Sequence, residues 1–156
     1  FLGVRVTVVH DQVFLDGVLT EDTFDWYAQD TQGNVWYLGE QSCEIVNNQC
    51  ASTAGSWEAG VDGALPGVIM WADPAAQKGF TYRQEYFAGE AEDVAKVVGT
   101  NASATVPYGS FSNCIETVDW SLLENPSREH KTYCPGTGLV LEVANGDRSE
   151  LVTITP

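Results

Sequence analysis

The sequence predicts an all-β, antiparallel fold, a meander of strands that forms a sandwich or a partly open barrel with a long irregular loop in the middle. Apolar and polar residues alternate with a period of two in many segments, as in strands with one buried face. Asp-Gly and Asn-Gly pairs separate several of these segments, and such pairs favour tight hairpins because both turn residues adopt positive φ. The length of 156 residues suits one domain, residues 1–156.

In the first half of the chain, two long segments show the alternation. Residues 4–8 alternate valine with polar residues, and in residues 24–29 the pattern predicts that Phe24 and Trp26 face the core. Turn signals follow these segments at Asp16-Gly17, Gln32-Gly33-Asn34 and Asn47-Asn48. We therefore expect antiparallel strands joined by short turns.

The middle of the chain, residues 51–79, is rich in Gly and Pro and is predicted to be a long loop around a short apolar strand, residues 68–71. Residues 90–98 have a composition that also suits a helix, but their alternation predicts a strand. Asn145-Gly146 is predicted to join two last strands, residues 139–143 and 151–154.

Four cysteines without Cys-x-x-Cys spacing predict two disulfides, because a zinc site usually takes its thiolates in closely spaced pairs. Cys43 and Cys50 flank a predicted Asn-Asn turn, and Cys114 and Cys134 lie in strand-like runs on either side of the turn-rich stretch 124–127. We expect these local pairings, with the crossed pairings and four free thiols as the alternatives. Disulfides indicate a secreted or cell-surface protein.

The formal charge of −15 argues against binding to nucleic acid or to an anionic membrane surface, because phosphate groups would be repelled. No apolar run reaches the roughly 20 residues of a membrane-spanning helix. A bound cation, a basic partner and simple solubility stay open as reasons for the acidic composition.

Signals for catalysis are weak, and we expect no enzyme. The chain lacks Gly-x-Ser-x-Gly, and Ser110 is interpreted as a turn or strand serine. His10 and His130 are interpreted as surface histidines and not as bases or ligands. No glycine-rich loop leads into a helix, so a phosphate site is not predicted.

Two acidic clusters are candidates for a structural calcium ion, although neither has the ligand ladder of an EF-hand. They are Glu21, Asp22 and Asp25, and Glu90, Glu92 and Asp93. Trp57, between glycines, is predicted to be the most exposed tryptophan and hence a candidate to stack on a glycan. Asn101 is a candidate for N-glycosylation in a predicted turn.

Several strings, taken together, resemble a family of exported bacterial proteins of unassigned function over nearly the whole chain. They are EDTFDWYAQD (residues 21–30), GNVWYLGE (33–40), GSWEAG (55–60), YRQEY (82–86), GEAED (89–93), VPYGSF (106–111) and GTGLV (136–140). The resemblance implies export and a β-rich fold. It implies no activity, no catalytic residues and no cofactor.

The chain differs from that family in two ways. The family carries a further apolar segment upstream of the run that starts here at Phe1, and it has a plain hairpin where Cys43 and Cys50 stand. A missing strand would leave a row of unpaired backbone groups in the sheet, which is costly unless another strand fills it. The segment 2–10, with Val4, Val6 and Val8 as its apolar side chains, is therefore predicted to add to the sheet of a second copy.

The sequence thus predicts a non-catalytic, extracellular structural protein that self-associates by strand addition into a homo-oligomer or filament. The alternative for residues 2–10 is pairing within their own domain. The alternative function is a monomeric exported module that binds calcium or a glycan.

Overall fold

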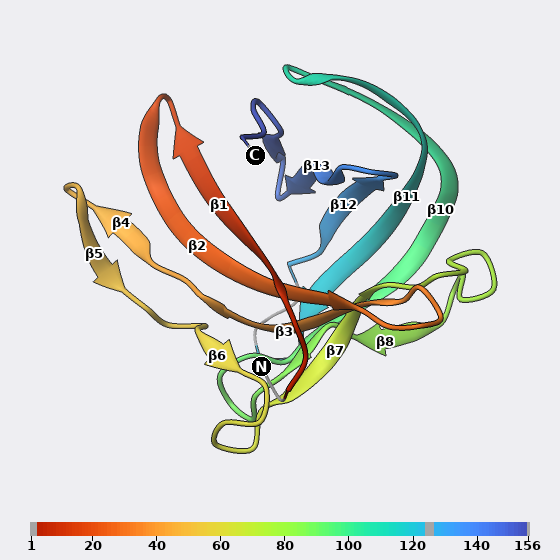
Figure 1. The fold of residues 1–156 in the computed structure, drawn as a ribbon. Helices are drawn as coiled ribbons and strands as arrows, with labels where there is room; N and C mark the ends of the chain where they lie inside the picture. The colour runs from red at the N-terminus through yellow and green to blue at the C-terminus, as the bar shows by residue number, and fades with distance from the viewer. Residues whose placement is uncertain (1–2, 124–126, 156) are drawn as a thin grey trace. The chain divides into compact units, whose positions relative to one another are not determined.

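β-Strands make up the regular structure of the described residues, 3–123 and 127–155, in a computed structural model (Figure 1). The predicted all-β, antiparallel fold class is confirmed, and the described residues contain no helix. Two predictions fall outside the described residues, namely the opening of the first segment at Phe1-Leu2 and the turn at residues 124–126. No helix that could cross a membrane occurs in the part of the chain that the structure describes.

The first of two compact units comprises Phe1–Ala72 and Arg83–Asp93. Its strands are β1 (Thr7–Leu15), β2 (Val18–Gln29), β3 (Val35–Gln41), β4 (Glu44–Val46), β5 (Gln49–Ser52), β6 (Trp57–Glu58), β7 (Leu65–Met70) and β9 (Glu85–Tyr86). They form one sheet in the order β5-β4-β2-β3-β7-β9, with β1 on β2 and β6 on β3. β2 is therefore central, because β1 lies along one side of it and β3 and β4 along the other.

The second unit comprises Asp73–Tyr82 and Val94–Pro156. Its sheet runs β14-β13-β12-β11-β10-β8, so that β10 to β14 form the predicted meander. Its strands are β8 (Thr81–Arg83), β10 (Asp93–Val106), β11 (Gly109–Ser121), β12 (Glu129–Cys134), β13 (Gly138–Ala144) and β14 (Asp147–Glu150). The division into two units does not test the expectation of a single domain, which stays a prediction.

The predicted tight turns are present, and the backbone angles of their residues are those that such turns require. Asp16-Gly17 joins β1 to β2, Asn47-Asn48 joins β4 to β5, and Asn145-Gly146 joins β13 to β14. All six residues have positive φ, as a two-residue hairpin turn that matches the strand twist requires. The turn residues thus set where each hairpin begins and ends.

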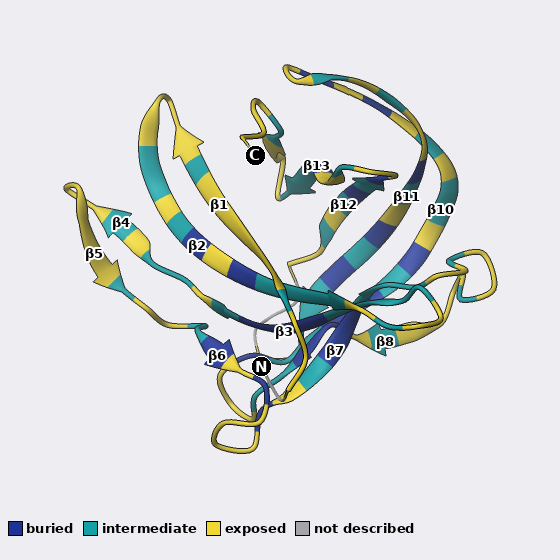
Figure 2. Ribbon diagram, in the orientation of Figure 1, coloured by how far each residue is buried: buried dark blue, intermediate teal, exposed yellow. Residues whose placement is uncertain are grey.

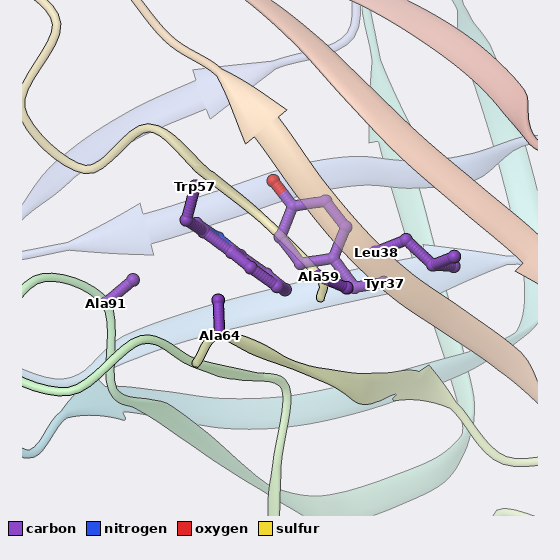
Figure 3. Packing of buried hydrophobic residues seen from close by; sticks show 6 residues of the cluster. All are labelled: Tyr37, Leu38, Trp57, Ala59, Ala64 and Ala91. Atoms are coloured by element: carbon purple, nitrogen blue, oxygen red, sulfur yellow. The ribbon is translucent and has the colours of Figure 1, made fainter. Parts of the chain in front are cut away.

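The core of the first unit is small and aromatic. Tyr37 and Leu38 of β3 pack with Trp57 of β6 and with three alanines, as Figure 3 shows. The Tyr37 and Trp57 rings meet edge to face with their centroids 5.5 Å apart. In the second unit the buried cluster is Ala104, Cys114, Cys134 and Val140.

Three sequence predictions about local structure are wrong. In β2, Thr23 and Asp25 are buried and Phe24 is exposed, so Phe24 does not face the core as predicted, whereas Trp26 is partly buried and packs against the core cluster. The last strand is Asp147–Glu150 and not residues 151–154. Asn101 lies exposed within the long strand β10 and not in a turn.

Candidate functional site

The candidate site is the outer edge of β1, the strand that begins the first sheet. Its register with β2 starts at Thr7 opposite Tyr27 and ends at Leu15 opposite Val18, with one irregularity between Val13 and Phe14. Within residues 3–123 and 127–155, β1 pairs with β2 alone. Alternate residues of an edge strand point their N–H and C=O groups away from the sheet, so β1 presents an open row of backbone donors and acceptors.

The residues of β1 are exposed along almost its whole length, as the colouring in Figure 2 shows. Among them Val8 is 54%, Phe14 53% and Leu15 67% exposed. The strand contains no proline and no lysine, the residues that commonly protect an edge from pairing. A nine-residue edge that exposes apolar residues on both sides of the polar segment 10–12 is suited to pair with a further strand.

Polar contacts across the hairpin link β1 to β2. Asp22 accepts hydrogen bonds from His10 Nε2 at 2.5 Å and from Gln12 Nε2 at 3.0 Å. The bond from His10, followed by that from Gln12, holds the pKa of Asp22 below its ordinary value. The His10 ring also stacks on Phe24, with centroids 4.1 Å apart. These contacts order the strand while its outer edge stays open.

The three valines of the segment predicted to add to a second copy do not all lie in one strand. Val4 and Val6 precede β1, and Val6 packs against the core of its own unit. Val8 lies in β1 opposite Trp26. Residues 7–10 therefore pair within their own chain, which is the alternative weighed from the sequence, and the open edge is the far side of β1.

Both predicted disulfides are present. Cys43–Cys50 ties the β4–β5 hairpin, with a Cα–Cα distance of 5.6 Å, and Cys114–Cys134 joins β11 to β12 inside the second unit's core. No cysteine is free among the described residues, which include all four. Two disulfides are consistent with an extracellular protein.

The acidic side chains of the two predicted calcium clusters do not gather around a common point. Asp22 contacts His10, whereas Asp25 is buried and accepts a hydrogen bond of 2.6 Å from the Tyr37 hydroxyl. Glu92 accepts from the Gly89 amide and faces Arg83 at 3.6 Å. In the described stretches of the chain, no three His, Cys, Asp or Glu side chains are grouped so as to hold a metal ion.

The prediction that Trp57 is exposed and therefore able to stack on a glycan is wrong. Trp57 is only 4% exposed, and its Nε1 donates a hydrogen bond of 2.8 Å to the buried Glu85 carboxylate. The flanking glycines suggested an exposed loop, but they make the turns that fold the indole into the core. Ser110 lies in β11 within 3.1 Å of Thr105 on the neighbouring strand, as a strand serine would.

Sequence reasoning missed an acidic pair in the first sheet, which consists of the buried Asp25 and the partly buried Glu40. Asp25 of β2 and Glu40 of β3 are cross-strand partners, and the Tyr37 hydroxyl donates its hydrogen bond to Asp25. Burial, and then the nearby Asp25 charge, raise the pKa of Glu40 to about 7. Only the pairing of the two strands brings these carboxyl groups together, so no local pattern could have shown them.

Glu40→Gln is expected to remove a pH-dependent loss of stability. Because the pKa of Glu40 is raised in the folded protein, folding favours its protonated form, and stability falls as pH rises from about 4.5 towards 7. The loss is about 2 kcal/mol, using about 1.4 kcal/mol per pKa unit and a discount for residual solvent screening. Denaturant unfolding at pH 5 and pH 8 measures this difference in stability, and Glu58→Gln, at an exposed site, is the control. If stability changed equally with pH in Glu40→Gln and in the wild type, Glu40 would not be the cause.

Comparison of the chain with protein-family models, with curated proteins and with solved structures finds no match. The candidate site is therefore inferred from the structure of this chain alone.

Proposed function

We propose that the protein is a non-catalytic, extracellular structural protein that self-associates by strand addition at the outer edge of β1. The single observation that carries this proposal is an edge strand of nine residues that is open to pairing and exposes apolar side chains. Backbone hydrogen bonds give such an addition its affinity, and the alternate side chains give it specificity.

A second copy of the chain is a suitable occupant, because β1 is self-complementary when it pairs antiparallel with itself about Asp11. That register places Val8 opposite Phe14 and Val9 opposite Val13 of the other copy. Cross-strand pairs of β-branched and aromatic residues each contribute about 0.2–1 kcal/mol. The same register sets Asp11 opposite Asp11, a like-charge contact that weakens the pair at low ionic strength.

Symmetric pairing of β1 with β1 closes on itself and gives a dimer. A filament requires β1 to meet a different edge of the next copy, for example β5 or β14, which end the two sheets. Association must also overcome the repulsion between chains of net charge −15. We therefore expect it to strengthen as added salt screens that repulsion.

The double variant Val8→Lys/Phe14→Lys is expected to stay monomeric where the wild-type protein associates, because lysine on an edge strand blocks pairing. Sedimentation velocity over a range of protein and salt concentrations measures the association. Val152→Lys/Ile154→Lys is the matched control: it also replaces two exposed apolar residues and makes the same change in charge, but outside the strands.

The control is expected to associate like the wild type. If the size of the assembly stops increasing at a dimer as concentration rises, the symmetric pair is indicated. If the size continues to increase, a filament is indicated. A wild-type protein that stays monomeric at every concentration and salt, or a β1 variant that assembles as the control does, would contradict the proposal.

A further inference from the structure

One lysine in the second sheet is surrounded by carboxylates from three adjacent strands. Lys131 of β12 lies opposite Thr117 of β11 and opposite Glu142 of β13, so the three side chains share one face of the sheet. Asp119 and Glu129 form the next cross-strand pair along the same face. The Lys131 Nζ lies 3.1 Å from Glu129, 3.6 Å from Glu142 and 3.8 Å from Asp119.

The members of this cluster differ in their contact with solvent. The side chain of Asp119 is 3% exposed and that of Lys131 is 20% exposed, while Glu129 and Glu142 retain 34% and 28%. Asp119 is thus the carboxylate with the least hydration. Thr117, next to it on the same face, is fully buried, and its hydroxyl has no hydrogen-bond partner among the described residues.

We propose that Lys131 and Asp119 become joined by an intramolecular amide bond between Nζ and Cγ, so that β11 and β12 are covalently linked within one sheet. The ammonium of Lys131 and the carboxylate of Asp119 are the reactants. The Nζ–Cγ bond forms and one Cγ–O bond breaks. Two of the three ammonium protons leave with that oxygen as water, the third stays on the amide nitrogen, and the two opposite charges disappear.

Proximity favours this step, because a reaction between groups held in contact has an effective concentration of about 10⁵ M or more when the geometry is aligned. Burial favours the product, because the amide replaces two charges that have lost much of their hydration. The buried Thr117 hydroxyl provides a hydrogen-bonding group beside the new amide.

Glu142 is suited to move the proton that the amine must lose before it can attack. Burial raises the pKa of Glu142 above its ordinary value, so it accepts a proton more readily than a solvated glutamate. Burial alone would lower the pKa of Lys131, but Tyr133 and the three carboxylates raise it well above its usual value. The amine is therefore protonated at rest, and we expect a slow, single event after folding.

Intact mass spectrometry of the wild-type chain, folded and then reduced and denatured, tests the proposal. The expected mass is lower than the sequence mass by one water, and digestion is expected to give one branched peptide that links Lys131 to Asp119. In Lys131→Arg the loss is expected to disappear, because a guanidinium does not acylate readily, while Lys78→Arg, at an exposed site, is expected to keep it.

A wild-type mass equal to the sequence mass would overturn the proposal, and it does so whether or not any variant folds. A water lost in Lys131→Arg as well would also overturn it, since the Asp-Gly pairs at residues 16–17 and 62–63 can lose water by forming a succinimide. A branched peptide that joins Lys131 to Glu129 or Glu142 would contradict the assignment to Asp119.

Discussion

Gly39→Ala is expected to destabilise the first unit by roughly 3–5 kcal/mol, because two separate costs coincide at this position. Gly39 has φ +135°, a conformation that other residues adopt only with strain. A Cβ placed there would collide with the backbone carbonyl oxygen of Trp57, and it would also lie 3.1 Å from the Trp26 ring. The backbone pairing of β3 with β6 must shift to make room.

Two glycine variants make the controls for Gly39→Ala. Gly63 has φ +87°, but no atom lies within 4 Å of a Cβ placed there. Gly63→Ala is therefore expected to lower stability by the backbone strain alone, about 1 kcal/mol. Gly109 has ordinary φ and open space, and Gly109→Ala is expected to be nearly neutral. Denaturant unfolding followed by tryptophan fluorescence measures the series. A cost for Gly39→Ala no larger than that for Gly63→Ala would show that the close approach to Trp57 is absent.

The Cys114–Cys134 disulfide is expected to stabilise the protein more than Cys43–Cys50. In the chain-entropy model, a separation of 20 residues contributes about 3 kcal/mol and a separation of 7 about 2 kcal/mol. Cys114 is also fully buried in the core of the second unit, so replacing it with alanine leaves a cavity. Alanine pairs at the two sites, compared by denaturant unfolding, measure the difference.

Graded reduction of the native protein gives an independent check on the two disulfides. Cys50 is exposed, so the Cys43–Cys50 bond is expected to be reduced and alkylated first, while Cys114–Cys134 stays intact until the unit unfolds. Simultaneous loss of both bonds under native conditions would contradict the burial of the second bond.

Local signals in the sequence were enough to predict the fold class. Asp16-Gly17 and Asn145-Gly146 each require positive φ at two successive positions, and a hairpin meets that requirement. The cysteine pairs were predictable for the same reason, since each pair flanks a turn region. These features depend on residues close together in the chain.

Features that depend on strand pairing were not predictable. In β2 the register with β3 shifts between Asp25 and Tyr27, and this irregularity breaks the alternation from which the buried face was inferred. Asp25 is buried because β3 brings Tyr37 to it, although its neighbours in the sequence suggest an exposed acidic cluster. The contacts of Lys131 with Asp119 and Glu142 likewise require the registers of β11, β12 and β13.

The resemblance to exported bacterial proteins stays a prediction, as does secretion. The prediction that residues 2–10 add to the sheet of a second copy is not met by residues 7–10, and the proposal that a further strand adds to β1 is a different one. Residues 7–10 are paired to β2, so it is the opposite side of β1 that would accept a further strand.

Hydrogen exchange of the β1 backbone amides at low and high protein concentration tests this claim most directly. The outward-facing amides of residues 7–15 are expected to exchange fast in dilute protein and to become protected as concentration rises, while the amides bonded to β2 stay protected throughout. Unchanged exchange along β1 at concentrations where the protein has associated would show that assembly uses another surface.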